Sequence, residues 1–273
     1  MDGVLVVKLG GGLDPGRALD NVAALRGAGT DVVLVHGGGA EADLLAGQLG
    51  HPVQTIEAAD GTRSRRTDDT ALDVLAMALL GRVKPALVGG LRARGVIAAG
   101  LCGADGALLT AERKTAIRSR ENGRVRLIRD DRAGRVTHVA PAILRALLAG
   151  GLVPVVSPPA ADEGGRLLNV DADQVAAAIA TALGAHALVL LTDVPGVLSD
   201  PPDPASLIAR LDCSGPGPAA VSGRMRHKVR AAVRARLAGV RHVAIGHGGI
   251  DGPVDAALNG VGTVVVGTQQ VGT

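Results

Sequence analysis

Two glycine triplets and a lysine are the first residues in the chain whose types and spacing could do chemistry. Gly10-Gly11-Gly12 and Gly37-Gly38-Gly39 each follow an apolar run and precede a helical pattern, so their backbone N–H groups can approach an anion at a helix N-terminus. Lys8 directly follows four apolar residues, where a charged side chain costs desolvation unless it reaches a partner. Neither triplet fits the Walker A or GxGxxG pattern. Together the three features predict a phosphate site, although either triplet alone could be only a tight turn.

Two polar clusters in the second half of the chain extend this prediction. The segment 169–174, Asn-Val-Asp-Ala-Asp-Gln, opens a predicted helix, and capping and the helix dipole account for at least one of Asp171 and Asp173. The segment 223–228, Gly-Arg-Met-Arg-His-Lys, is a basic helix start, which opposes the dipole and indicates a bound phosphate. His36 is interpreted as a structural histidine beside a turn.

The elements that must position these residues alternate between strands and helices. Apolar β-branched runs followed by helical patterns predict an α/β fold, a three-layer α/β/α sandwich with a mostly parallel central sheet and two lobes. Ligands of parallel sheets bind outside the carboxyl ends of the strands, which suits Lys8. Asp14-Pro15 is predicted to supply an N-cap and a first-turn proline. The predicted strands are 4–7, 32–35, 96–101, 153–156, 187–192, 240–245 and 264–266, and the later helices are 71–80, 84–94, 140–149, 172–183 and 224–238.

Residues 114–139 interrupt the alternation. The turn signal Glu121-Asn122-Gly123, followed by alternating Arg124-Val125-Arg126-Leu127, predicts a β-hairpin with its arginines on one face. Such a basic patch suits docking of an acidic protein, and a solvated charged face is the alternative. The basic residues of this segment are Arg113, Lys114, Arg118, Arg120, Arg124, Arg126 and Arg129.

Composition narrows the class of protein. The 273 residues carry a formal net charge of only +3, which is too weak to indicate nucleic-acid binding. Phe, Tyr and Trp are absent, so single-stranded nucleic acid cannot stack on aromatic rings and an adenine must lie between aliphatic and backbone surfaces. No apolar stretch approaches the roughly 20 uncharged residues of a membrane span, and no signal segment precedes the first strand. Cys102 and Cys213 lie far apart and are expected to be reduced thiols, so we expect a cytoplasmic protein that does not bind nucleic acid or membranes.

Six segments, in order, resemble the motif series of the amino-acid kinase fold, in its acetylglutamate kinase branch. The resemblance covers essentially the whole chain, and the ordered set is far more specific than any one segment. The segments are Val7–Gly11, Val35–Gly39, Gly100–Gly106, Asn169–Gln174, Thr192–Val197 and Gly223–Lys228.

Within that branch the chain is most similar to the LysW-aminoadipate kinases. Ser64-Arg65-Arg66-Thr67-Asp68 is similar to their Ser-Arg-x-Thr-Asp segment, and 113–116 with 121–125 match their basic hairpin. The early first strand leaves no N-terminal helix like that of arginine-inhibited acetylglutamate kinases.

The resemblance implies a role for each matching residue. Lys8 and Lys228 would stabilise the transition state and Asp173 would hold both lysines. The residues implied to bind the acyl-amino acid are Gly38, Gly39, Arg65 and Asn169. Those implied to bind ATP and its phosphates are Gly10, Gly11, Thr192, Asp193, Gly196, Gly223 and Met225.

The implied reaction transfers the γ-phosphate of ATP to the side-chain carboxylate of an N-blocked acidic amino acid, LysW-linked 2-aminoadipate or LysW-linked glutamate. A carboxylate is ionised at neutral pH, so the reaction needs no general base, and Mg²⁺ is expected on the ATP phosphates without a protein metal site. Residues 1–178 would form the amino-acid-binding and dimerisation lobe and 179–273 the ATP lobe, in a homodimer. The acidic carrier protein LysW would dock on hairpin 113–129.

Three alternatives remain open from the sequence. An acetylglutamate kinase would act on free N-acetyl-L-glutamate. A non-catalytic sensor of amino acids or nucleotides could share the fold, although the presence of both lysines and Asp173 argues against it. A nucleic-acid-binding role based on the basic hairpin is the third.

Overall fold

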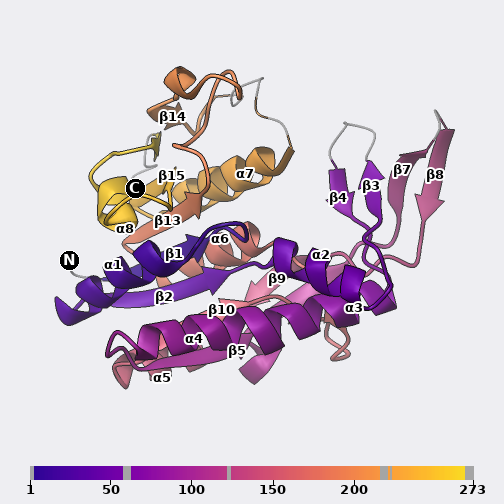
Figure 1. Ribbon diagram of the computed structural model, residues 1–273, viewed down its shortest axis with the longest axis horizontal. Coiled ribbons are helices and arrows are strands. Elements are labelled where there is room, and N and C mark those ends of the chain that lie inside the picture. The colour runs from indigo at the N-terminus through magenta and orange to yellow at the C-terminus, as the bar shows by residue number, and fades with distance from the viewer. Residues whose placement is uncertain (1–2, 58–62, 122–123, 216–220, 222, 268–273) are drawn as a thin grey trace, which may run out of the picture.

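An eight-stranded sheet crosses the computed structural model of the protein, which describes residues 3–57, 63–121, 124–215, 221 and 223–267 (Figure 1). Every neighbouring pair is parallel except β15 and β16, which confirms the predicted mostly parallel sheet. The strands lie in the order β14 (Arg210–Asp212), β16 (Thr263–Val266), β15 (His242–His247), β13 (Ala187–Thr192), β1 (Val4–Leu9), β2 (Asp31–His36), β10 (Val153–Ser157) and β5 (Ala98–Cys102).

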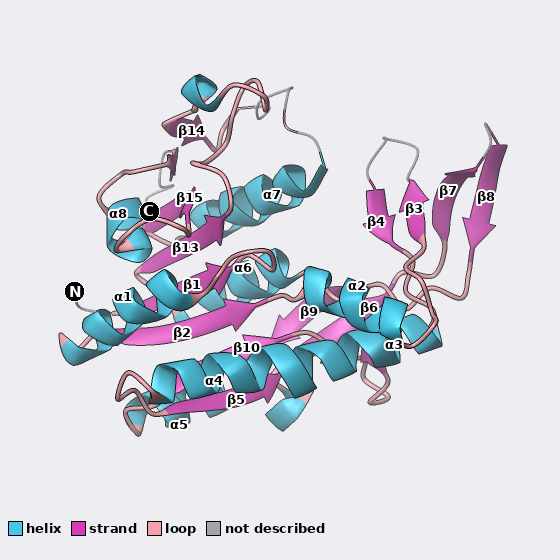
Figure 2. Ribbon diagram, viewed as in Figure 1, coloured by secondary structure: helices cyan, strands magenta, loops and turns pink. Residues whose placement is uncertain are grey.

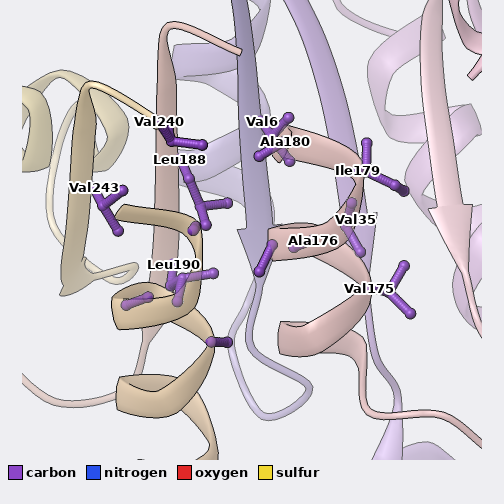
Figure 3. Packing of buried hydrophobic residues seen from close by; sticks show 14 of the residues in the cluster. Val6, Val35, Val175, Ala176, Ile179, Ala180, Leu188, Leu190, Val240 and Val243 are labelled. Carbon is purple, nitrogen blue, oxygen red and sulfur yellow. The ribbon is translucent and has the colours of Figure 1, made fainter. Parts of the chain in front are cut away.

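Helices cover both faces of this sheet, which confirms the three layers. Alternate residues of each buried strand point to opposite faces, so Leu5 and Val7 join one core cluster while Val6 joins the other. Figure 3 shows the second cluster, where Val175 and Ile179 of one helix pack near the strands. The first face carries α1 (Gly16–Gly27), α4 (Lys84–Arg92) and α8 (Pro253–Leu258), and the second carries α5 (Ala142–Ala149), α6 (Ala172–Leu183) and α7 (Gly223–Leu237).

One long helical run replaces the two predicted helices 71–80 and 84–94. It consists of α3 (Asp69–Ala76), the π-helical segment η1 (Met77–Val83) and α4 without a break. Pro85 lacks an N–H, and the wider π turn before it lets the chain pass the proline without ending the helix. The prediction of a break was therefore wrong.

This run is also long and apolar enough to pass as a membrane span by composition, with a mean hydropathy of 1.5. Within this protein, 39% of that apolar window is buried. Leu87 and Leu91 are buried against the sheet, and Leu75 and Leu79 pack on α2 (Gly39–Gln48).

Smaller sheets extend from the carboxyl end of the main sheet. A four-stranded sheet has the order β12 (Leu167–Leu168), β11 (Ala160–Ala161), β6 (Leu109–Arg113) and β9 (Gly134–Val139). Two hairpins, β3 (Thr55–Glu57) with β4 (Arg63–Arg65) and β7 (Ile117–Glu121) with β8 (Arg124–Ile128), stand side by side at one end of the molecule (Figure 2). The short helices η2 (Asp105–Ala107) and η3 (Pro204–Ser206) lie in loops.

The β7–β8 pairing confirms the predicted hairpin, and alternation within β8 puts positions 124 and 126, the two arginines of the alternating run, on one face of it, while Arg118 of β7 lies on the other. Arg118 pairs with Leu127, whereas the next residue, Ser119, pairs with Arg126. Because neighbouring residues of a strand point to opposite faces, Arg118 and Arg126 lie on opposite sides of the hairpin. The predicted Asn122-Gly123 turn falls outside the described residues.

The remaining differences are small. The helix after Lys8 starts at Gly16 with Pro15 at the N-cap, so the proline lies one position earlier than predicted. Asp14 accepts a hydrogen bond from the Gly16 N–H at 3.0 Å without occupying the cap position itself. The expected lobe boundary at residue 178 falls inside α6, and one continuous sheet joins the strands on either side of it.

Candidate active site

A buried carboxylate holds two ammonium groups at the centre of the site. The Nζ atoms of Lys8 and Lys228 lie 2.7 Å and 3.0 Å from the same Oδ1 atom of Asp173. All three side chains are buried, with 6–7% of each residue exposed. Lys8 comes from β1, Asp173 from the first turn of α6 and Lys228 from α7, so three separate elements converge here.

The local structure explains why the two aspartates of the 169–174 segment differ. Asp171 is the N-cap of α6 and accepts a hydrogen bond from the Gln174 N–H at 2.9 Å. Asp173, one position inside the helix, points to the lysines instead. The structural explanation offered by helix capping therefore applies to Asp171 and leaves Asp173 for the ion pairs.

With both lysines protonated, the three buried side chains carry one net positive charge. Burial alone would raise the pKa of Asp173, but the charges of Lys8 and Lys228 outweigh burial and hold that pKa below its usual value. Burial, and then the charge of Lys8, lowers the pKa of Lys228 although Asp173 opposes this change. A buried uncompensated cation is costly, so the arrangement favours binding of an anion beside the lysines.

The two glycine triplets meet at this end of the sheet. A methyl group placed on Gly11 would lie 3.2 Å from the backbone nitrogens of both Gly38 and Gly39. A methyl group on Gly38 would lie 2.5 Å from Leu79 Cδ2 of the long helix, and one on Gly10 would lie 3.0 Å from the Leu191 carbonyl oxygen. Close packing therefore favours glycine at these positions, and it brings two N–H-rich loops together at the carboxyl ends of β1 and β2.

The residues predicted to bind nucleotide lie at the carboxyl end of β13 and at the start of α7. Thr192 is buried and donates to Asp193 Oδ1 at 3.1 Å, while Asp193 itself is exposed. Gly196 packs tightly, because a methyl group there would lie 2.7 Å from the Thr263 hydroxyl oxygen. Gly223 is the exposed first residue of α7 with φ +56°, and Met225 is half-buried against the core.

The residues predicted to bind the amino acid form a second group. Arg65, at the end of β4, donates to the Gly39 carbonyl at 3.0 Å and forms an ion pair with Asp43. Asn169 donates from Nδ2 to the Thr67 hydroxyl oxygen at 3.0 Å. The structure therefore places Arg65 beside the second glycine triplet and connects Asn169 to the same segment that carries Arg65.

Three buried polar residues near the site were not predicted from the sequence. Thr67 and Asp131 are 0% and 1% exposed, and they interact although 64 positions separate them. No sequence signal connects them. Lys84 donates to the Leu101 carbonyl at 2.5 Å, and burial lowers its pKa to about 8. From the sequence alone, Lys84 is the first residue of the predicted helix 84–94 and is not singled out.

His36 fits the structural role predicted for it. It is 1% exposed, its Nδ1 atom lies 2.9 Å from the Gly37 carbonyl, and its Nε2 atom has no hydrogen-bond partner. Burial, and then the charges of Lys84 and Lys8, lowers its pKa to about 4 against the opposing hydrogen bond to Gly37. A neutral imidazole therefore supports the turn.

Metal ligands are sparse around these groups. Within the described part of the chain, no three His, Cys, Asp or Glu side chains cluster in a way that could hold a metal ion. The Asp173 carboxylate already holds both lysines.

Buried lysines beside N–H-rich glycine loops at the carboxyl end of a parallel sheet suit phosphoryl transfer. Residues 3–247 match the amino acid kinase family, and the chain belongs to that family. It is a kinase that uses ATP and transfers phosphate to a carboxyl group.

Two similar proteins and one similar solved structure illustrate the comparison. The chain is 40% identical over 268 residues to the LysW-aminoadipate kinase of Thermus thermophilus, covering 96% of this chain and 100% of that protein. It is 37% identical over 280 residues to an acetylglutamate kinase of Synechococcus, covering 97% and 84%. The solved structure of smu.665 from Streptococcus mutans UA159 shares the fold with a TM-score of 0.76 at 24% identity, covering 97% and 99%.

Proposed function

We propose that the protein phosphorylates the side-chain carboxylate of 2-aminoadipate, or of glutamate, whose amino group is linked to the carrier protein LysW. The product is an acyl phosphate, an intermediate of lysine or arginine biosynthesis. The observation that carries the phosphoryl-transfer part is the buried cluster of Lys8, Asp173 and Lys228 with its net positive charge. The 40% identity to a LysW-aminoadipate kinase over nearly the whole chain supports the choice of acceptor.

The chemistry requires alignment and charge stabilisation more than proton transfer. A side-chain carboxylate with a pKa of about 4.3 is already ionised, so its oxygen attacks the γ-phosphorus and the bond to the β-phosphate oxygen breaks. The obstacle is repulsion between two anions. Lys8 and Lys228 would contact the transferring phosphoryl group, because both ammonium groups retain N–H donors beyond those used on Asp173.

The glycine loops would supply the remaining donors. Gly11 and Gly38 lie close enough to direct backbone N–H groups at one phosphoryl group, and Gly10 belongs to the same loop. Thr192, Asp193, Gly196, Gly223 and Met225 would line the nucleotide site. Mg²⁺ would reach the site on ATP.

Arg65 and Asn169 would bind the α-carboxylate end of the acceptor, next to Gly38 and Gly39. The guanidinium of Arg65 is already oriented by the Gly39 carbonyl and by Asp43, which lowers the entropy that binding has to remove. Residues 1–178 would serve the acceptor and 179–273 the nucleotide, with Asp173 close to that boundary.

The carrier would dock on the hairpin segment 113–129, next to the acceptor site. Arg118 and Arg126 are both exposed, and the neighbouring β3–β4 hairpin carries Arg65. An acidic surface would be attracted to this basic segment. We also propose that the protein is a homodimer in the cytoplasm.

Hydroxylamine trapping of the acyl phosphate tests the acceptor directly. The purified protein is incubated with ATP, Mg²⁺ and either carrier-linked 2-aminoadipate, carrier-linked glutamate or free N-acetyl-L-glutamate. We expect hydroxamate and ADP with a carrier-linked acceptor at much lower concentration than with the free one. Efficient turnover of free N-acetyl-L-glutamate alone would contradict the proposal in favour of an acetylglutamate kinase, which the 37% identity to such an enzyme makes the second candidate.

A further inference from the structure

A closed set of hydrogen bonds joins three segments that are far apart in the sequence. The hydroxyl oxygen of Thr67 accepts from Asn169 Nδ2 at 3.0 Å and lies 3.5 Å from the Arg65 carbonyl oxygen. The Thr67 carbonyl accepts from the Arg132 N–H at 2.6 Å, and the Arg132 carbonyl accepts from the Asn169 N–H at 2.9 Å. Both residues proposed to bind the α-carboxylate are thus tied to Thr67.

The buried carboxylate of Asp131 joins this network through two backbone hydrogen bonds. One carboxylate oxygen accepts from the Thr67 N–H at 2.9 Å, and the other accepts from the Ala133 N–H at 2.6 Å. The side chain is buried, and burial raises the pKa of Asp131 although these two hydrogen bonds and the charge of Lys114 oppose the rise. A carboxylate buried in this way is costly unless its acceptors are used, so the two backbone donors fix its orientation.

The same junction is the base of the β7–β8 hairpin. Arg113 donates to the Asp131 carbonyl at 2.8 Å and to the Arg129 carbonyl at 2.7 Å. Arg66, between Arg65 and Thr67, donates to Asp130 at 2.7 Å. The segment that carries Arg65 and the hairpin proposed to meet the carrier therefore share one set of contacts.

We infer that Thr67 and Asp131 are positioning residues for the acceptor, which hold the Asn169 amide and the Arg65 backbone in the geometry that binds the α-carboxylate. The inference rests on the proposed function for the identity of the acceptor. Thr67 acts through its hydroxyl, which fixes the Asn169 amide with Nδ2 toward itself and leaves Oδ1 and the second N–H for the acceptor. Asp131 acts through the Thr67 backbone.

The test compares Thr67→Val, which has nearly the same shape but no hydroxyl, with Thr67→Ser, which keeps the hydroxyl. In Thr67→Val the Asn169 amide loses its partner, so we expect KM for the acceptor to rise about tenfold while kcat and KM for ATP stay within about twofold of wild type. Thr67→Ser should behave like wild type. Thr137→Val is the matched control, because Thr137 is an exposed threonine on β9 whose hydroxyl donates to the Thr110 carbonyl at 3.2 Å.

Asp131→Asn is the second variant. The amide replaces one acceptor by a donor that faces a backbone N–H, so either Thr67 or Ala133 loses its bond. We expect the same selective rise in KM for the acceptor. An unchanged acceptor KM in Thr67→Val, or an equal rise in KM for ATP, overturns the inference.

Assays with both classes of acceptor distinguish a failure of this inference from a failure of the proposed function. Carrier-linked and free N-acyl acceptors share the α-carboxylate, so the Thr67 comparison is made with whichever acceptor the wild type phosphorylates. Activity only with N-acetyl-L-glutamate would refute the carrier while still testing Thr67. Independently of turnover, the side-chain amide NMR signal of Asn169, assigned by its loss in Asn169→Asp, should shift in Thr67→Val but not in Thr67→Ser. An unshifted signal in Thr67→Val also overturns the inference.

Discussion

The proposed phosphoryl-transfer end and the proposed acceptor end of the site are built in different ways. Lys8, Asp173 and Lys228 come from a central strand and two packed helices, all three are buried, and both ammonium groups lie within 3.0 Å of one Asp173 oxygen atom. The acceptor end instead depends on two projecting hairpins and on long-range contacts of Thr67 and Asp131 (Figure 1). The first end is held by the core of the fold, and the second by hydrogen bonds between loops.

We infer from this difference that the core elements carry the phosphoryl-transfer chemistry and that the hairpins determine which acceptor binds. Groups on rigid elements keep the geometry that phosphoryl transfer requires. Groups on hairpins can differ between relatives that act on different acceptors without disturbing the core. The arrangement predicts that changes at the first end alter stability and kcat, whereas changes at the second alter the choice of acceptor.

The largest effect on stability is expected from Asp173→Asn. The substitution leaves two buried ammonium groups without their carboxylate, so the free energy of unfolding should fall by about 3–5 kcal/mol at neutral pH. The loss should shrink as the pH rises, because deprotonation of one lysine removes one of the two uncompensated charges. Asp171→Asn is the control, since Asn caps a helix about as well as Asp. Equal stability of the two variants in urea would show that the buried cluster is not the anchor of this end.

His36, buried next to the second glycine triplet, should make the stability of the protein sensitive to acid. Its pKa falls from 6.5 in the unfolded chain to about 4 in the folded protein, so between these values the unfolded state binds a proton that the folded state does not. Stability should therefore decline as the pH falls from 6.5 to 4, by about 3 kcal/mol in total from this residue. Urea unfolding across this range should show a shallower decline for His36→Gln than for wild type. Parallel curves would contradict the buried neutral imidazole.

A smaller and more selective effect is expected at the basic hairpin. Arg118 shares the open face with the exposed Leu127, whereas Arg126 shares a face with the buried residues Ser119 and Ile128. Arg118→Glu should therefore lower kcat/KM for a carrier-linked acceptor by about tenfold, and Arg126→Glu by less. Neither should affect a free N-acyl acceptor. Equal losses with both acceptors would remove the docking role of this hairpin.

The sequence predicted the elements of the proposed phosphoryl-transfer end better than those of the proposed acceptor end, for a physical reason. The boundaries of β13 and α6 were predicted to the residue, because buried strands and capped helices have local signatures in residue type and spacing. The resemblance to a known family singled out Lys8, Lys228 and Asp173, whose roles in this chain stay predictions.

Features that depend on distant contacts could not be predicted in this way. Nothing in the neighbourhood of Thr67 points to Asp131, and alternation within β8 alone could not show how its partner strand is registered. The π segment before Pro85 was missed because proline usually signals a helix end. Long-range pairing decides the first two features, and the helical turn before Pro85 decides the third.

The most direct test of the account is kcat for Lys8→Ala and Lys228→Ala, measured as ADP release with saturating ATP and acceptor. Each variant loses one of two cations that would stabilise the transferring phosphoryl group, so each should lower kcat by at least about 10²-fold. Lys114→Ala, an exposed lysine outside the cluster, assayed with a free acceptor, should retain wild-type kcat. Near-normal turnover in either Lys8→Ala or Lys228→Ala would contradict the assignment of this buried cluster as the catalytic centre.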